Sequence, residues 1–122
     1  MKNYTAADFG PNGEAVAALI ERIKNLTPDQ AMELGGTWNA ARYAVLDAAR
    51  SAAWTAAWGS VWGAVWDAVR GAVWDAVREE SRDSIWYAVR AATIALATQD
   101  LISEEDFNTL YGPWASVMEA GK

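Results

Sequence analysis

The hydrophobic and polar positions of this chain follow a four-residue repeat from Thr37 to about Ile94. In each repeat a polar residue or Gly is followed by a position that is mostly Ala, by one that is Val, Ala or Ile, and by a large residue. Because Ala is the strongest helix former and no proline lies between Pro28 and Pro113, we expect a helical array over residues 37–98. The large positions of the array are Trp38, Arg42, Leu46, Arg50, Trp54, Trp58, Trp62, Trp66, Arg70, Trp74, Arg78, Arg82, Trp86, Arg90 and Ile94.

Shorter helices are expected on the N-terminal side of the array. After an irregular arm over residues 1–11, a one-sided apolar stripe predicts a helix over roughly 13–25, with Asn12 as its cap. The run from Thr27 to Gln30 predicts a second helix start, with Pro28 at the first helical position. We expect that helix to stop or bend at Gly35–Gly36, where Thr37 can cap the array.

On the C-terminal side, Ser103 and Asp106 predict the start of a final helix. We expect it to end at Gly112–Pro113, with residues 114–118 as a last turn packed on the body. The expected organisation is a single all-α domain, 1–122, made of an N-terminal arm and helices (1–36), the array (37–98) and a C-terminal segment (99–122).

The period of the array decides how it can be buried. An α-helix turns about 100° per residue, so each four-residue step drifts by about 40°, and large side chains spread all the way round a long helix. A continuous helix over residues 37–98 would be about 90 Å long, whereas the flanking helices offer about 45 Å of partner. We therefore expect either a hairpin that breaks near Gly59–Gly63 or copies of the chain that cover one another in a homo-oligomeric bundle, and we favour self-association. The packing and interface residues are predicted to be Trp54, Trp58, Trp62, Trp66, Trp74 and Trp86.

Charge narrows the possible partners. The net charge is −6, yet within residues 37–94 six Arg balance six acids, so the excess of acid lies in the flanks. A neutral array between acidic ends argues against binding to nucleic acid or to anionic lipid. The longest uncharged run, Ser51–Trp66, has 16 residues and is shorter than the roughly 20 that span a bilayer.

The residue types offer little chemistry. The chain has no Cys and no His, which removes thiolate sites, the usual general base and the commonest metal ligand. The carboxylates at 79–83 and 104–106 match no calcium loop and are expected to be solvated surface. We therefore predict no catalytic residue, no metal site and no cofactor. Asp–Arg pairs three residues apart, such as Asp67 and Arg70, are expected to support the helices and to occupy the arginines.

A ligand site is the alternative use of the array. Trp and Arg share one register, and indole faces stack on aromatic rings while guanidinium groups donate paired hydrogen bonds to phosphate. If the fold brings them together between helices, they could hold an anionic aromatic ligand. The candidate ligand-binding residues are Arg70, Trp74, Arg78, Arg82, Trp86 and Arg90.

Runs such as Ala-Ala-Trp-Thr-Ala-Ala-Trp (52–58) and Val-Trp-Asp-Ala-Val-Arg (73–78), with the closing segment 100–114, carry a resemblance. Over residues 26–118 the chain resembles small Ala/Trp/Arg-rich tetrapeptide-repeat proteins encoded by actinobacterial phages. It departs from them by using Val and Gly where they mostly have Ala. The resemblance implies a phage-encoded accessory protein of the host cytoplasm, and it supplies no functional residues.

Two functions follow from these observations. The first is a non-enzymatic accessory protein that acts through helix-to-helix self-assembly and binds a host or virion protein. The second is a binder that sequesters a nucleotide-like signalling ligand, as a counter-defence protein would, by Trp stacking and Arg clamps. We rank the interaction protein first because it requires nothing beyond packing.

Overall fold

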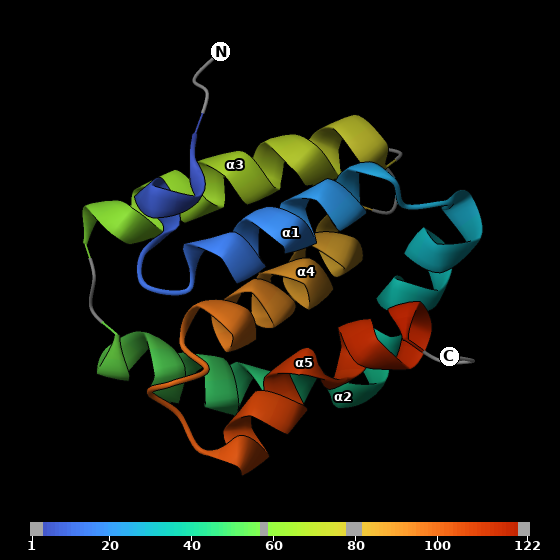
Figure 1. Ribbon diagram of the computed structural model, residues 1–122. Helices are drawn as coiled ribbons and strands as arrows, with labels where there is room; N and C mark the ends of the chain where they lie inside the picture. Colours follow the sequence, from blue (N-terminus) through green and yellow to red (C-terminus); the bar gives the residue numbers. More distant parts are fainter. Residues whose placement is uncertain (1–3, 57–58, 78–81, 120–122) are drawn as a thin grey trace.

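The computed structural model describes residues 4–56, 59–77 and 82–119, and the chain in these ranges is all-helical, without strands (Figure 1). The expected all-α fold class is confirmed. The elements are the short 3-10 helix η1 (Ala6–Phe9) and the α-helices α1 (Gly13–Lys24), α2 (Pro28–Thr55), α3 (Ser60–Ala76), α4 (Arg82–Ala97) and α5 (Glu104–Met118).

The helices form two groups joined by α4. Figure 1 shows α3 and α2 on opposite sides of the molecule, with α1 and α4 between them. On one side α3 packs against α1 and η1, and on the other α2 packs against α5. The central helix α4 contacts α1 and α3 as well as α2 and α5. Its residues from Ala91 to Ala95 are all buried, which an isolated amphipathic helix would not show.

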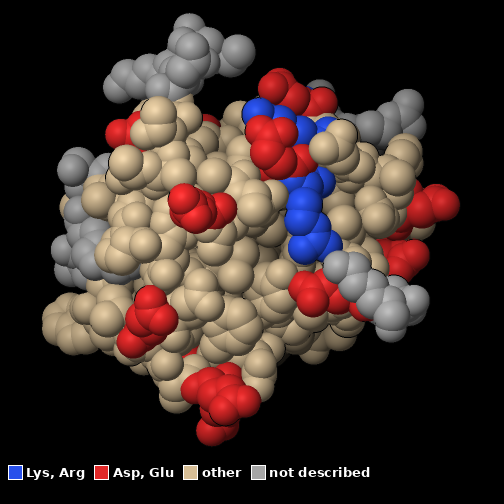
Figure 2. Space-filling view, in the orientation of Figure 1, with Lys and Arg blue, Asp and Glu red and all other residues tan. Residues whose placement is uncertain are grey.

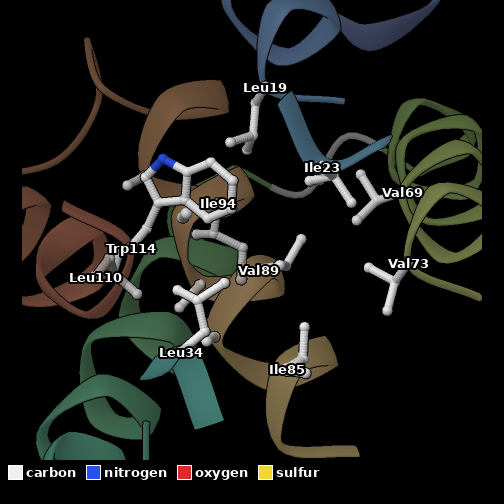
Figure 3. Packing of buried hydrophobic residues seen from close by; sticks show 14 of the residues in the cluster. Leu19, Ile23, Leu34, Val69, Val73, Ile85, Val89, Ile94, Leu110 and Trp114 are labelled. Carbon is white, nitrogen blue, oxygen red and sulfur yellow. The ribbon is translucent and has the colours of Figure 1, made fainter. Parts of the chain in front are cut away.

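The core lies around α4. Figure 3 shows Ile85, Val89 and Ile94 of this helix between side chains from the other helices, with Trp114 of α5 beside Ile94. Both buried threonines of this region bond to their own helix, since the Thr93 hydroxyl donates to the carbonyl oxygen of Val89 at 2.8 Å. The core is therefore apolar except for these threonines, whose hydroxyls are hydrogen-bonded, and the indole nitrogen of Trp114, which has no hydrogen-bond partner among the described residues.

The array does not form one long helix; it is divided among α2, α3 and α4. The first break lies at the N-terminal edge of the expected window, where α2 ends at Thr55 and Gly59 precedes α3 with φ +56° and ψ −112°. This left-handed backbone conformation favours glycine. At this break the indole N–H of Trp62 donates a hydrogen bond to the carbonyl oxygen of Ala56. The second break lies between Ala76, the last residue of α3, and Arg82, the first of α4, and was not expected.

The arrangement of α2, α3 and α4 also differs from the expected hairpin. The helices on either side of Gly59, α2 and α3, pack mainly against other helices, whereas α3 and α4 pack against each other across the second break. Three separate helices, each shorter than the expected rod of about 90 Å, offer one another more neighbours than that rod would have. One chain therefore covers part of the array: Trp38 is buried, Trp62, Trp66, Trp74 and Trp86 are half-buried, and Trp54 is exposed.

The two predicted helix stops are wrong, while the alternative of a bend at Gly35–Gly36 stays a prediction. Helix α2 passes through Gly35–Gly36, and Thr37, instead of capping a new helix, places its hydroxyl 3.0 Å from the carbonyl oxygen of Leu34 and 3.2 Å from that of Pro113. Helix α5 likewise continues through Pro113 to Met118. In both places buried neighbours hold the helix together, since Leu34 and Trp114 are fully buried. Tertiary packing here outweighs a local preference of about 1 kcal/mol per glycine.

The predicted helix starts fare better. Thr27 and Gln30 form a reciprocal capping box, and the Ser103 hydroxyl accepts a hydrogen bond from the Asp106 N–H. The first helix has nearly the expected bounds and Asn12 is its N-cap residue, but the Asn12 side chain accepts no hydrogen bond from the helix. The Asn12 side chain instead donates to the carbonyl oxygen of Ala97 at 3.2 Å and so joins the start of α1 to the end of α4.

Candidate functional site: the Trp/Arg seam and the outer face of α2

The tryptophans of the array differ widely in exposure. Trp38 and Trp54 lie at the same position of the repeat on α2, yet their side chains are 7% and 88% exposed. Four repeats of drift turn the second side chain by about 160° relative to the first. Trp38 therefore packs inward, stacked on Tyr87 with ring centroids 5.3 Å apart, while Trp54 points outward. Of the predicted packing residues, Trp54 is thus not packed, and Trp58 lies outside the described residues.

The other predicted packing residues meet where α3 lies against α4. Trp62 stacks on Trp66 at 5.3 Å, Trp66 meets Trp86 edge-on at 6.0 Å, and Trp86 meets Trp74 edge-on at 6.1 Å. All four indoles are half-buried. These residues, with the arginines that stack on them, form what we call the Trp/Arg seam, and their packing fits the sequence interpretation of the tryptophans as helix-contact residues.

Three arginines of the candidate ligand set also join the seam. Arg70 lies over both Trp74 (5.7 Å) and Trp86 (5.6 Å), Arg82 over Trp74 (5.4 Å), and Arg90 over Trp66 (5.4 Å). The structure thus brings together five of the six candidate ligand residues. The sixth, Arg78, lies outside the described residues.

The seam is filled by its own side chains. Arg82 donates from Nε to the carbonyl oxygen of Val77 (3.1 Å) and from Nη2 to that of Trp74 (3.0 Å), so its guanidinium group caps the end of α3. Arg70 and Arg90 lie on indole faces, where a ligand ring would have to stack. The geometry resembles a set of cation–π contacts that hold two helices together more than an open ligand pocket.

The expected ion pairs of the array are absent from the described part of the chain. Asp67 and Arg70 do not form a salt bridge; Asp67 accepts a hydrogen bond of 2.6 Å from the hydroxyl of Tyr4. That hydrogen bond is the main reason why the pKa of Tyr4 is raised above 10.0. In the ranges that the structure describes, the salt bridge is that of Lys24 with Glu21. Four described arginines of the array therefore lie over aromatic faces and form no salt bridge with a described carboxylate: Arg42, Arg70, Arg82 and Arg90.

An open groove lies between α2 and α4, beside the seam. Its volume is about 460 Å³, and its lining residues are Leu46, Ala49, Arg50 and Trp54 of α2 and Arg90 of α4. Arg50 and Trp54 are exposed, and neither arginine forms a salt bridge with a carboxylate of the described residues. The sequence pointed to Trp54 and Arg90 but missed Arg50 and Leu46, which the drift of the repeat brings to the same side.

The side of α2 turned away from the core carries large apolar residues. We call this surface the outer face of α2: its members Met32, Tyr43, Leu46 and Trp54 are 76%, 73%, 39% and 88% exposed. On a helix of about 100° per residue they fall within about 80° of one another, opposite the buried Leu34, Val45 and Ala52. Helix α2 is therefore apolar on two opposite sides. Sequence reasoning missed Met32 and Tyr43, although their spacing of 11 residues, three helical turns, places them on one side.

A second hollow, of about 380 Å³, lies between η1, α1 and α3. Asp67, Asp75 and Glu21 line it, and Lys24 is paired with Glu21. Among the residues that the structure describes, no three acidic side chains are grouped closely enough to hold a metal ion. The hollow is bordered by Tyr4, whose hydroxyl is bonded to Asp67, so two of its polar groups already satisfy each other.

Charge is unevenly distributed over the surface. Figure 2 shows acidic side chains scattered over one face of the molecule, where Lys and Arg gather near the C-terminal end of α1. Arg22 and Lys24 occupy the last turn of that helix. No helix in the described ranges is long and apolar enough to span a membrane.

Comparison with protein-family models, with curated proteins and with solved structures finds no match to this chain. The function therefore has to be argued from the geometry of the seam, the groove and the outer face of α2.

Proposed function

We propose that this protein is a non-enzymatic interaction protein that works by helix-to-helix association, first with copies of itself and then with a host or virion protein. The observation that carries the proposal is the outer face of α2. Soluble monomers rarely expose large apolar patches, and several large apolar side chains on one side of a helix indicate an interface. Tyr, Trp and Met, which make up most of this face, are also enriched at protein interfaces.

The rest of the molecule supports the same proposal. The core and the seam are packed within one chain, so the outer face of α2 is a separate surface and not a gap in the core. The chain resembles phage-encoded accessory proteins, and we therefore place it in the host cytoplasm. An outer face free for a second protein suits an accessory protein that assembles before it meets its target.

Light scattering on the purified protein, measured across a dilution series, tests the proposal. We expect a mass above that of the 13.2 kDa protomer at high concentration. Tyr43→Asp introduces a charge into the middle of the outer face and should return the protein to the protomer mass with unchanged helical circular dichroism. Leu101→Asp, at a residue that is 49% exposed but outside α2, is the control and should still associate.

A protomer mass for the unmodified protein at every concentration would overturn self-association. Equal loss of association in Leu101→Asp would instead show that any added charge disperses the protein, and the outer face of α2 would lose its special role.

The second candidate function, sequestration of a nucleotide-like ligand, is favoured by the groove between α2 and α4. An uncovered indole and two arginines without carboxylate partners are the groups that stack a base and bind phosphate. The test is to incubate the protein with a mixture of cellular nucleotides, denature it and analyse what is released. Ligand recovered from the unmodified protein but not from Arg50→Gln would support this function, and an empty extract would reject it.

A further inference from the structure

The outer face of α2 has a symmetric spacing. Tyr43 lies in the middle, Met32 is 11 residues before it and Trp54 is 11 residues after it. Gly36 and Arg50 lie seven residues on either side. When two copies of such a helix lie antiparallel about a two-fold axis at Tyr43, residue i of one copy faces residue 86 − i of the other. We infer that the outer face of α2 pairs with the same face of a second copy in this antiparallel arrangement; the inference rests on the proposed self-association.

The side chains fit each other in this register. Arg50 faces Gly36 of the second copy, which is exposed and has no atom within 4 Å of an added Cβ, so the large side chain meets open space. Trp54 faces Met32, and a methionine thioether makes favourable contact with an aromatic ring. Tyr43 meets Tyr43 of the second copy at the axis, and on either side of it large residues face small or flexible ones, which is how helices interdigitate.

Charge selects the antiparallel direction. The N-terminal third of α2 carries Asp29 and Glu33 with no basic residue before Arg42, whereas Arg50 lies near its other end. Parallel copies in register would place Glu33 against Glu33 and Arg50 against Arg50. Antiparallel copies place Glu33 within about one helical turn of the second copy's Arg50. Two attractive Glu33–Arg50 pairs then replace the two repulsive pairs of the parallel arrangement.

The groove between α2 and α4 receives the acidic end of the second copy. Its rim carries Arg50 and Arg90, and neither has a carboxylate partner among the described residues. Glu33 and Met32 of the second copy pass over Trp54 and these two guanidinium groups. The net charge of the chain is −6, so this groove is a local basic site to which an acidic segment of the same chain is complementary.

The size of the surface indicates a modest affinity. Tyr43 and Trp54 together expose on the order of 350 Å² per copy, about half of the roughly 800 Å² per partner in a standard stable interface. The remaining area comes from the residues that flank these side chains. We therefore expect a dimer that dissociates on dilution in the micromolar range.

Cysteine cross-linking tests the direction, because the chain has no cysteine of its own. Asn39 and Asp47 are both exposed on α2, and their numbers add up to 86, so they face each other in the proposed pair. An equimolar mixture of Asn39→Cys and Asp47→Cys proteins should form a disulfide-linked dimer under mild oxidation. Each variant alone should not, because identical positions lie about 12 Å apart along the helix axis, beyond the roughly 7 Å that a disulfide allows. Leu101→Cys is the off-surface control and should stay monomeric on a non-reducing gel.

Each outcome decides the matter. Cross-linking of each variant with itself at least as fast as in the mixture would show a parallel pair and overturn the inference while leaving self-association intact. No cross-link, with a multimeric mass by light scattering, would place the interface elsewhere. No cross-link and a protomer mass would reject the proposed function as well, and a nucleotide recovered from such a monomer would assign the groove to a small molecule.

A charge exchange gives an independent measurement. Glu33→Arg and Arg50→Glu should each weaken dimerisation about tenfold by placing like charges together. The double variant restores both attractions in the antiparallel pair and should recover most of the lost affinity. Additive weakening in the double variant would overturn the inference.

Discussion

The Trp/Arg seam and the outer face of α2 are built from the same four-residue repeat, yet one is closed and the other is open. In the seam, the tryptophans of α3 find those of α4, and arginines lie on their faces. On α2, the repeat starts inward at Trp38 and points outward at Trp54, where no other helix in the described part of the chain covers it. The comparison teaches that a four-residue period does not keep large side chains on one face of a helix. A helix with this repeat must break often if its large side chains are to be buried, and α2, the longest unbroken helix, is the one that exposes them.

The largest effect expected from this comparison concerns two tryptophans. Trp86→Ala removes two edge-on ring contacts and the cation–π contact between Arg70 and Trp86. It should therefore lower the free energy of unfolding by about 2–3 kcal/mol. Trp54→Ala should change it by less than about 0.5 kcal/mol in dilute solution. Urea unfolding followed by circular dichroism measures both. Equal losses would show that Trp54 is covered in the protomer and that the two regions do not differ.

The arginines offer the next contrast. Arg82→Gln removes a cap of two hydrogen bonds and a cation–π contact, and should cost about 1–2 kcal/mol of stability. Arg50→Gln, on the outer face of α2, should cost less than about 0.5 kcal/mol. Thermal unfolding of the two variants side by side checks this difference. A stable Arg82→Gln variant would mean that the seam does not depend on its arginines.

Tyr111 extends the comparison to α5, the helix that packs against α2. Burial, and then the hydrogen bond to Glu119, raise the pKa of Tyr111 to about 12. Because the folded pKa lies above the unfolded value of about 10, the folded state holds this proton more tightly. Its contribution is complete below about pH 10 and is lost as the pH rises from 10 to about 12.

Tyr111 is only half-buried, so we expect a loss of about 1 kcal/mol and not the full effect of the shift. Unfolding of the native protein and of Tyr111→Phe should be compared across this pH range. The native protein should lose more stability than the variant. The same decline in both would show that other groups are responsible.

The smallest expected effect distinguishes a glycine inside a helix, Gly63, from a glycine at a helix break, Gly59. Gly63 lies inside α3 and an added Cβ meets no atom within 4 Å, so Gly63→Ala should raise stability by about 0.5–1 kcal/mol through helix propensity. Gly59 has the same open space but a φ of +56°, and Gly59→Ala should lower stability by about 1 kcal/mol. Unfolding midpoints in urea decide between them. A stabilising Gly59→Ala would indicate that the break is not fixed by this backbone conformation.

Several parts of this arrangement could be read from local sequence. The helix starts at Thr27 and Ser103 need only a side chain and the N–H three residues later, so the sequence predicted them. The structure also brings together the described members of the candidate ligand set. They occupy the same position of the repeat on α3 and α4, and these two helices pack against each other. The stops at Gly35–Gly36 and Gly112–Pro113 failed because buried neighbours, which local sequence does not reveal, offset the cost of glycine and proline.

The sequence by itself determined that the chain is helical, and that its repeat would carry large side chains around every long helix, because propensity and period are properties of local residues. Only the tertiary structure decided where the array breaks, which tryptophans are covered and which groups satisfy the arginines. Those outcomes depend on which helices become neighbours. The central position of α4 fixes that choice: it gathers α3 into the seam and leaves one side of α2 uncovered.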